Sequence, residues 1–331
     1  MALQVDANVV TELTWDYVQH NPALKKLYEK GKTSQWNAST DVDWSPEVNF
    51  GEPIESEFGE DFLEQFMPDS PVMRLGEEGR RRMAWEFQSW MVSQFMHGEQ
   101  GALVATARLV ETVPEIDAKF YAANQVADEA RHVEAYARYL NEKLKHQYPI
   151  SAPLQSLLED IMSEKRWDIT YLGMQIMVEG LALAAFGLGN VMFQDPIIKQ
   201  ITDLVMRDEA RHVAFGVLSL QGVYSEMTSA ELADREEFIM EATQLMHDRF
   251  MLEQVWERVG IDVEEGKAYT ATSPLMIIFR QMLFSKIVPN LRKLGLLSQP
   301  VRQQFERLNI IQFESHPDSA TEFDPALTAP A

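Results

Sequence analysis

The chain has 331 residues, 46% of them hydrophobic, and a formal net charge of −22. This length and apolar content allow a large buried core, while the negative charge disfavours nucleic acid and anionic membrane surfaces as partners. The absence of cysteine excludes disulfides, thiolate zinc sites and iron–sulfur clusters, so a redox site in this chain needs electrons from an external donor.

The N-terminal quarter is predicted to be only partly helical. Residues 8–30 favour one or two short helices interrupted at Asn21-Pro22, and 31–74 an irregular acidic arm that wraps the rest of the protein. The N-terminus has no basic region followed by an apolar run, so no signal peptide is expected. The longest apolar stretch, near 180–192, is predicted to be a buried helix too short to span a bilayer. We therefore expect a cytoplasmic protein without a membrane partner.

Four long helices are predicted in the middle of the chain. Their expected ranges are 76–112, 114 to just before Tyr148-Pro149, 168–193, and 195–224. A fifth helix is predicted over 229–259, after a capping box formed by Thr228 and Glu231, and two more open at Pro274 and Pro300. The expected organisation is an N-terminal arm, a four-helix core, C-terminal helices packed on that core and a disordered tail, at 1–74, 75–225, 226–312 and 313–331.

One pentapeptide, Asp-Glu-Ala-Arg-His, occurs at 128–132 and again at 208–212. Each copy contains a Glu-x-x-His pair, whose side chains share a helix face, and each follows a single glutamate at the same interval. Together these positions supply four carboxylates and two imidazoles, which is the ligand set of a dinuclear metal site inside a four-helix bundle. The predicted ligands are Glu99, Glu129, His132, Glu179, Glu209 and His212. Ligation by carboxylate and imidazole without sulfur favours two iron ions, or manganese with iron.

The neighbours of these ligands suggest supporting roles. Asp128 and Asp208 are expected to accept the N–H of the imidazole nitrogen that faces away from the metal, with Arg131 and Arg211 neutralising the aspartates; the alternative is an ordinary helical Asp–Arg pair. Small residues beside Glu99 and Glu179 leave room for dioxygen and substrate, or else serve close helix packing. The predicted pocket residues are Phe95, Met174, Leu183 and Phe186.

Tyr136 lies one turn after His132 on the same face, within reach of an oxidising metal pair. A redox role is one interpretation, and a buried structural tyrosine with a satisfied hydroxyl is the other.

With these motifs the chain resembles the ferritin-like di-iron carboxylate superfamily, in particular its ribonucleotide-reductase-like branch. The resemblance covers about 75–225 and includes the phrases around Glu179 and Glu209, and the segment leading to Gln35-Trp36-Asn37 is similar to the N-terminal part of that branch. It implies an all-α, ferritin-like four-helix bundle with flanking helices. Glu99 departs from the aspartate usual in reductase small subunits, and the tail has no tyrosine for long-range radical transfer. Leu183 stands where the hydroxylases of the superfamily commonly carry a threonine. Val205 stands where the arylamine N-oxygenases carry a third histidine.

The resemblance implies an O₂-dependent non-haem di-iron oxygenase or oxidase that hydroxylates a C–H bond or oxygenates an amine of a small organic substrate. A reductase or ferredoxin would supply electrons, and a homodimer is expected. The alternatives are the radical-generating small subunit of a ribonucleotide reductase, a ligand-binding oxidase related to it, and a non-catalytic iron-binding bundle.

Overall fold

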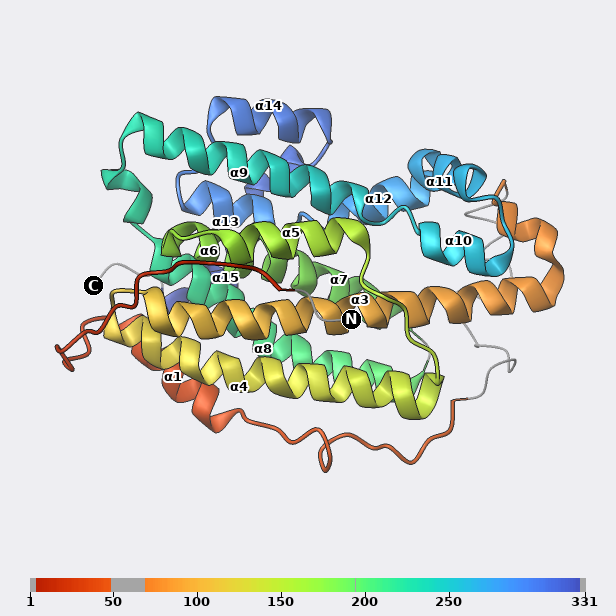
Figure 1. The fold of residues 1–331 in the computed structure, drawn as a ribbon, viewed down its shortest axis with the longest axis horizontal. Helices are drawn as coiled ribbons and strands as arrows, with labels where there is room; N and C mark the ends of the chain where they lie inside the picture. Colours follow the sequence, from red (N-terminus) through yellow and green to blue (C-terminus); the bar gives the residue numbers. More distant parts are fainter. Residues whose placement is uncertain (1–3, 49–68, 194, 328–331) are drawn as a thin grey trace.

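The structure is a computed structural model that describes residues 4–48, 69–193 and 195–327, and throughout these ranges the regular secondary structure is helical (Figure 1). Four long helical segments form the core, with α3 packed along α4 and α7 along α8. The core segments are α3 (Gly76–Thr112), α4 (Ile116–Arg138) with the π-helical extension η2 (Tyr139–Leu144), α6 (Trp167–Tyr171) continuing through the π-helical η3 (Leu172–Val178) into α7 (Glu179–Met192), and α8 (Pro196–Leu220). The predicted four-helix core is therefore present.

Local sequence signals explain where several helices begin. Pro196 occupies the first turn of α8, and the Asp195 carboxylate accepts the Ile197 N–H at 2.8 Å. The capping box of Thr228 and Glu231 opens α9 (Ser229–Asp248) as predicted. The single helix expected over 229–259 is wrong, however, because the chain turns at 249–252 before α10 (Glu253–Val259). Leu252 has a φ of 59°, a left-handed conformation that ends the helical path.

The N-terminal prediction needs correction. Residues 4–20 contain no helix, and α1 (Pro22–Thr33) starts only after Asn21, whose side chain caps it. The segment instead hydrogen-bonds to the first turn of α4, where the Asp117 carboxylate accepts the backbone N–H groups of His20 and Asn21 at 2.8 and 2.9 Å. Tertiary hydrogen bonds therefore replace the local ones that a helix would make. The irregular arm predicted over 31–74 is seen over 34–48, and 49–68 lie outside the described residues. The prediction is wrong at both ends, because α1 continues to Thr33 and the 3-10 helix η1 (Pro71–Leu75) begins at Pro71.

The described chain contains more helices than expected. Three helices before the tail were not predicted: α5 (Ala152–Ser163) between η2 and α6, and α11 (Val263–Thr272) and α13 (Ile287–Lys293) in the C-terminal third. The two predicted to begin at prolines are α12 (Pro274–Met282) and α14 (Gln299–Arg307).

The prediction of a disordered tail over 313–331 is wrong for 313–327. There η5 (Ile311–Ser315), α15 (Ser319–Phe323) and η6 (Pro325–Leu327) fold, and α15 packs on α8. Phe313 and Ala320 are buried, and Asp318 caps α15, which explains the order despite the polar composition.

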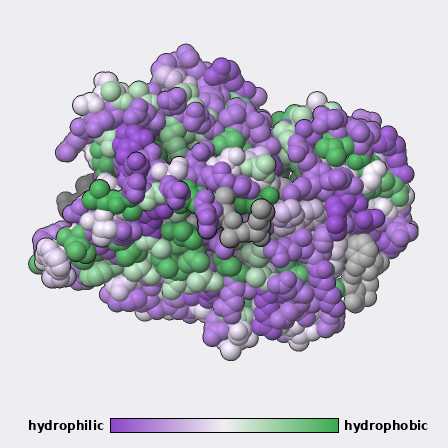
Figure 2. Space-filling model, in the orientation of Figure 1, coloured by the Kyte–Doolittle hydropathy of each residue, from purple (hydrophilic) through white to green (hydrophobic). Residues whose placement is uncertain are grey.

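The surface is mostly hydrophilic in the view of Figure 2, with hydrophobic atoms gathered on its left side. The N-terminal segment carries several exposed apolar side chains, namely Val10, Leu13, Trp15, Tyr17 and Val18. One helical stretch, Trp167–Met192, is long and apolar enough to cross a membrane, so the prediction that the apolar stretch over 180–192 is too short for a span is wrong by length. It is 78% buried in its most apolar window, as expected for the central helix of a bundle.

Candidate metal centre

The bundle brings all six predicted ligand residues together in its interior. Glu99 comes from α3, Glu129 and His132 from α4, Glu179 is the first residue of α7, and Glu209 and His212 come from α8. All six are at most 5% exposed. The π-helical segment η3 ends immediately before Glu179, and such insertions shift the side chains that follow them around the helix. Each helix therefore contributes to one buried cluster.

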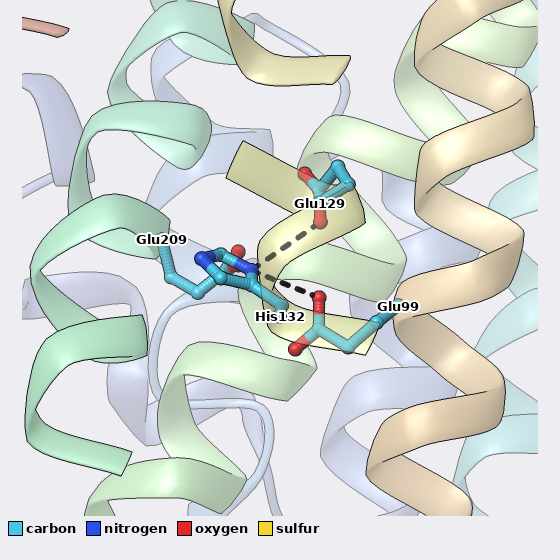
Figure 3. Close-up of side chains that lie close together, drawn as sticks. All are labelled: Glu99, Glu129, His132 and Glu209. Carbon is cyan, nitrogen blue, oxygen red and sulfur yellow. Dashed lines mark hydrogen bonds and ion pairs between the residues drawn. The ribbon is translucent and has the colours of Figure 1, made fainter. Parts of the chain in front are cut away.

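The ligand atoms form two overlapping groups. One contains Glu99, Glu129, His132 and Glu209, the other Glu129, Glu179, Glu209 and His212, and the ligand atoms of each group lie within 4.8 Å of one another. In Figure 3, Glu99, Glu129 and Glu209 surround the ring of His132. Its Nδ1 atom lies 3.2 Å from a carboxylate oxygen of Glu99 and 3.2 Å from one of Glu209. Glu129 and Glu209 belong to both groups, as expected of residues that bridge two metal ions.

Unpaired atoms show that this donor set fits metal ions. Five buried ligand atoms lack a hydrogen-bond partner: Glu99 Oε1, Glu129 Oε2, both carboxylate oxygens of Glu209, and His212 Nδ1. His212 Nδ1 is 3.1 Å from Glu129 Oε1, yet the geometry of this approach is not that of a hydrogen bond. Buried polar atoms without partners are costly, whereas divalent cations satisfy such atoms at once. The chemistry of the set, oxygen and imidazole nitrogen, suits iron or manganese.

The protonation equilibria of the cluster reflect its surplus of negative charge. Burial raises the pKa of Glu99 and of Glu179 well above the usual range, and neighbouring glutamates raise both further. For His132 and His212, burial favours a lower pKa, but the surrounding carboxylates outweigh it and raise the pKa well above its usual value. Without metal, the cluster therefore retains protons, and metal binding would release them.

A second layer of hydrogen bonds holds the two imidazoles, and it crosses between α4 and α8. Nε2 of His132 lies 3.1 Å from an Asp208 oxygen, and Nε2 of His212 lies 3.3 Å from an Asp128 oxygen. Nδ1 of each ring is thereby left facing the glutamates. The contacts between aspartate and imidazole are those expected from the repeated motif. That each aspartate serves the histidine of the other copy was not predicted.

Two arginines neutralise these aspartates. Arg131 pairs with Asp128 on its own helix and lies 3.0 Å from Asp208, while Arg211 pairs with Asp208 on its own helix and lies 3.5 Å from Asp128. The structure thus contains the ordinary Asp–Arg pairs within each helix, and it also contains the predicted contacts in which each arginine neutralises the aspartate of the other helix.

Three residues that the sequence interpretation did not place in the site also belong to it. The Gln35 amide donates to Asp128 at 2.7 Å, and Trp36 Nε1 donates to Asp208 at 2.8 Å. Gln125 donates to Glu129 at 2.8 Å and is 3.4 Å from Glu179. Gln125 lies one turn before Glu129, so helix periodicity could have indicated it. Gln35 and Trp36 come from the irregular arm, where spacing carries no such signal.

A small cavity opens beside Glu99 and Glu179. Phe95 and Phe186, both predicted, line it together with Ala102 and Leu181. Met174 and Leu183 do not line it: Met174 lies in the π-helical segment before Glu179, and Leu183 falls outside the stripe of α7 residues that faces the cavity. The free volume is about 30 Å³, about the room of one water molecule, so an organic substrate enters only as side chains move apart.

The cavity also contains a feature that helix spacing did not indicate. Arg249 and Phe250, from the turn after α9, also line it. Both residues were predicted to lie within a long helix over 229–259, and neither was expected to have a role in the site.

Tyr136 is fully buried on α4 and packs against Phe95 and Phe186, at ring-centroid distances of 6.0 and 6.1 Å. Burial raises the pKa of its hydroxyl, which faces Thr202 without hydrogen-bond geometry. A purely structural tyrosine was expected to have a hydrogen-bonded hydroxyl, and among the described residues the Tyr136 hydroxyl has no such bond. A redox role stays a prediction.

Comparisons with known proteins give matches among solved structures only. No family model matches the chain, and no curated protein matches its sequence. A variant of an R2-like ligand-binding oxidase with an anaerobically reconstituted Mn/Fe cofactor aligns at 17% identity over 83% of this chain and 93% of that one, with a TM-score of 0.47. Another variant of that oxidase aligns at 15% identity over 84% and 94%, with a TM-score of 0.45.

Proposed function

We propose that the protein is an oxygen-dependent oxidase or oxygenase with a dinuclear iron, or manganese and iron, centre. The observation that supports it is the pair of buried ligand groups that share Glu129 and Glu209 and whose donor atoms lack other partners. A bound iron-containing pair supplies the redox chemistry that activates dioxygen. The cavity beside Glu99 and Glu179 is where a small organic molecule meets that centre.

The chain's own residues have defined tasks in this proposal. Glu99 and Glu179 line the cavity, and each belongs to one of the two ligand groups, so each would hold a metal ion next to the place where the substrate binds. Asp128 and Asp208 fix the imidazole rings through Nε2 and make Nδ1 more basic. The apolar lining from Phe95 and Phe186 excludes water from the reacting atoms. C–H hydroxylation and amine oxygenation are the reactions proposed here.

Electrons come from outside the chain in this proposal, because the sequence contains no cysteine for a cluster of its own. A reductase or a ferredoxin is the proposed donor, and the protein is proposed to act as a cytoplasmic homodimer. Sedimentation of the purified protein tests the dimer, and reduction of the metal-loaded protein by a ferredoxin tests the donor.

The direct test measures metal content and oxygen uptake together. Protein loaded anaerobically with Fe(II) should hold two metal ions per chain and consume oxygen repeatedly when a chemical reductant is supplied. A double variant, Glu129→Ala with Glu209→Ala, removes both shared ligands and should lose both properties. Wild-type protein that holds no metal and takes up no oxygen contradicts the proposal. Metal binding with a single round of oxygen uptake instead indicates the non-catalytic iron-binding bundle.

A second candidate is the radical-generating subunit of a ribonucleotide reductase, or a ligand-binding oxidase related to it. The burial of Tyr136 one turn after His132, with an unpaired hydroxyl, favours this candidate. A radical-generating subunit would store an oxidising equivalent on the tyrosine and work only with a large catalytic partner. A stable tyrosyl radical, together with no turnover of small molecules, would favour this candidate over the first.

A further inference from the structure

We propose that Arg249 binds the carboxylate of the substrate, so that the substrate is an organic acid with an apolar body. This inference rests on the proposed function, since it names the substrate class of the same cavity. It starts from one side chain that the metal centre and its support do not use.

Arg249 is buried, and in the part of the chain that the structure describes it has no countercharge. It is 8% exposed, and within the described residues no carboxylate pairs with its guanidinium. Its Nε–H is buried and has no hydrogen-bond acceptor. An unpaired Nε–H alone is not unusual here, because Arg280 has one too. The other buried arginines nevertheless find partners for their terminal nitrogens: Arg235 binds the Asp168 carboxylate at 2.9 Å, and Arg280 donates to the Thr270 carbonyl at 2.7 Å. A buried and unpaired cation is costly, so Arg249 calls for a partner that the described residues do not supply.

The position of Arg249 indicates what that partner is. The side chain lines the same cavity as Glu99 and Glu179, and apart from these groups and Gln94 the lining is apolar, including Phe95, Leu181 and Phe186. Gln94, an uncharged polar side chain of the lining, already has its hydrogen-bond partners: it donates to the Pro149 carbonyl and accepts the Ser151 N–H. Arg249 is therefore the group left to recognise a polar substituent, and the planar guanidinium matches a carboxylate in a bidentate manner.

Interactions within the chain explain the arginine only in part. It follows α9, where a cation interacts favourably with the helix C-terminus, and its guanidinium lies 5.0 Å from the centroid of the Phe250 ring. Neither interaction supplies a hydrogen-bond acceptor for Nε. Burial lowers the pKa of Arg249 to about 10, which leaves the side chain charged at neutral pH. A substrate held by its acid group at Arg249 would extend its apolar part towards Glu99 and Glu179.

Binding to the metal-loaded protein, without reductant, tests the proposal separately from turnover. Titration calorimetry would compare benzoate with benzamide, and hexanoate with hexanamide. We expect at least one acid to bind at least about tenfold more tightly than its amide. Arg249→Met, which keeps length and apolar packing, should abolish that preference, and Arg249→Lys should keep part of it. Circular dichroism checks that both variants fold. If Arg249→Met does not fold, the comparison of Arg249→Lys with the wild type still tests the role of Arg249.

The outcomes separate this inference from the proposed function. A preference for the acid that persists in Arg249→Met means that the acid binds at the metal ions, which overturns the role of Arg249. Equal affinity for acids and amides in the wild type overturns it as well, even if oxygen consumption shows that the protein is an oxidase. Loss of the preference in Arg249→Met supports the inference, and does so even where oxygen uptake fails and the proposed function falls.

Discussion

Nε2 of His132 on α4 lies 3.1 Å from the carboxylate of Asp208 on α8. The contact joins the first copy of the repeated pentapeptide to the second, and the reciprocal contact joins His212 to Asp128 at 3.3 Å. Each copy therefore supplies ligands to the cluster and orients the imidazole of the other copy. Weakening the hydrogen bond to one aspartate should therefore disturb the binding of metal by the histidine on the opposite helix.

The variant Asp208→Asn tests this cross-helix support. The amide carries no charge and can face His132 with its NH₂ group, so His132 should be less well oriented and less basic. We expect metal affinity to fall about 10–100-fold, measured by competition with a chelator. Asp203→Asn on the exposed side of α8 is the matched control and should bind metal like the wild type. Equal losses in both variants would show that Asp208 has no special role.

Metal removal should destabilise the fold, because the four buried glutamates then lose their counterions. At a free metal concentration about 1,000 times Kd, binding contributes about 4 kcal/mol to the free energy of unfolding. For a chain of this size we expect the unfolding temperature to rise by roughly 5–10 °C on loading with Fe(II) or Mn(II). Mg²⁺ at the same concentration should have a smaller effect, since it disfavours imidazole ligands. An unchanged transition, followed by calorimetry, would argue against a metal site.

How much of this site follows from sequence depends on whether a residue lies on a core helix. Glu99, Glu129 and Glu209 could be predicted because helix periodicity fixes their common face and the duplicated motif fixes their number. The support from Trp36 could not be derived in this way, because an irregular arm brings it to Asp208. Arg249 was missed for a related reason: the pattern over 229–259 is helical, and the turn at Leu252 depends on tertiary packing.

Replacing Tyr136 distinguishes the two candidate functions. Phenylalanine preserves the packing against Phe95 and Phe186 and removes the redox-active hydroxyl. If the protein oxidises small molecules, Tyr136→Phe should keep oxygen uptake within a few-fold of the wild type. If it is a radical-generating subunit, electron paramagnetic resonance should detect a tyrosyl radical in the oxidised wild type that is lost in the variant. Tyr171→Phe, another buried tyrosine, controls for general effects of losing a phenol.

Close packing between α8 and η3 should make Gly216 sensitive to substitution. A Cβ atom there would approach the Gln175 side chain to 2.7 Å and its carbonyl oxygen to 3.3 Å. We expect Gly216→Ala to lower the free energy of unfolding by about 1–3 kcal/mol, measured in denaturant. Gly98→Ala on α3 meets no atom within 4 Å and should raise it by about 0.5–1 kcal/mol. A stabilising effect at Gly216 would show that the helices are less closely packed.

Glu164 gives a prediction about acid stability outside the metal centre. Burial favours a higher pKa, but hydrogen bonds from the Arg166 side chain and from the N–H groups of Arg166 and Lys165 outweigh it and lower the pKa of Glu164 to about 2. A carboxylate whose pKa falls on folding stabilises the protein above its usual pKa of 4.5, and this contribution is lost as the pH falls towards 2. Since Arg166 is 45% exposed, solvent screening limits the effect to about 1 kcal/mol.

The variant Glu164→Gln should therefore be less stable than the wild type at pH 7, with a difference that shrinks as the pH drops below 4.5. Urea unfolding at pH 7, 5, 4 and 3 measures this difference. Glu142→Gln, which removes an exposed partner of Arg138 one helical turn away, should change stability by less than about 0.5 kcal/mol. A difference between wild type and Glu164→Gln that stays constant from pH 7 to pH 3 would show that the carboxylate charge of Glu164 does not stabilise the junction between α5 and α6.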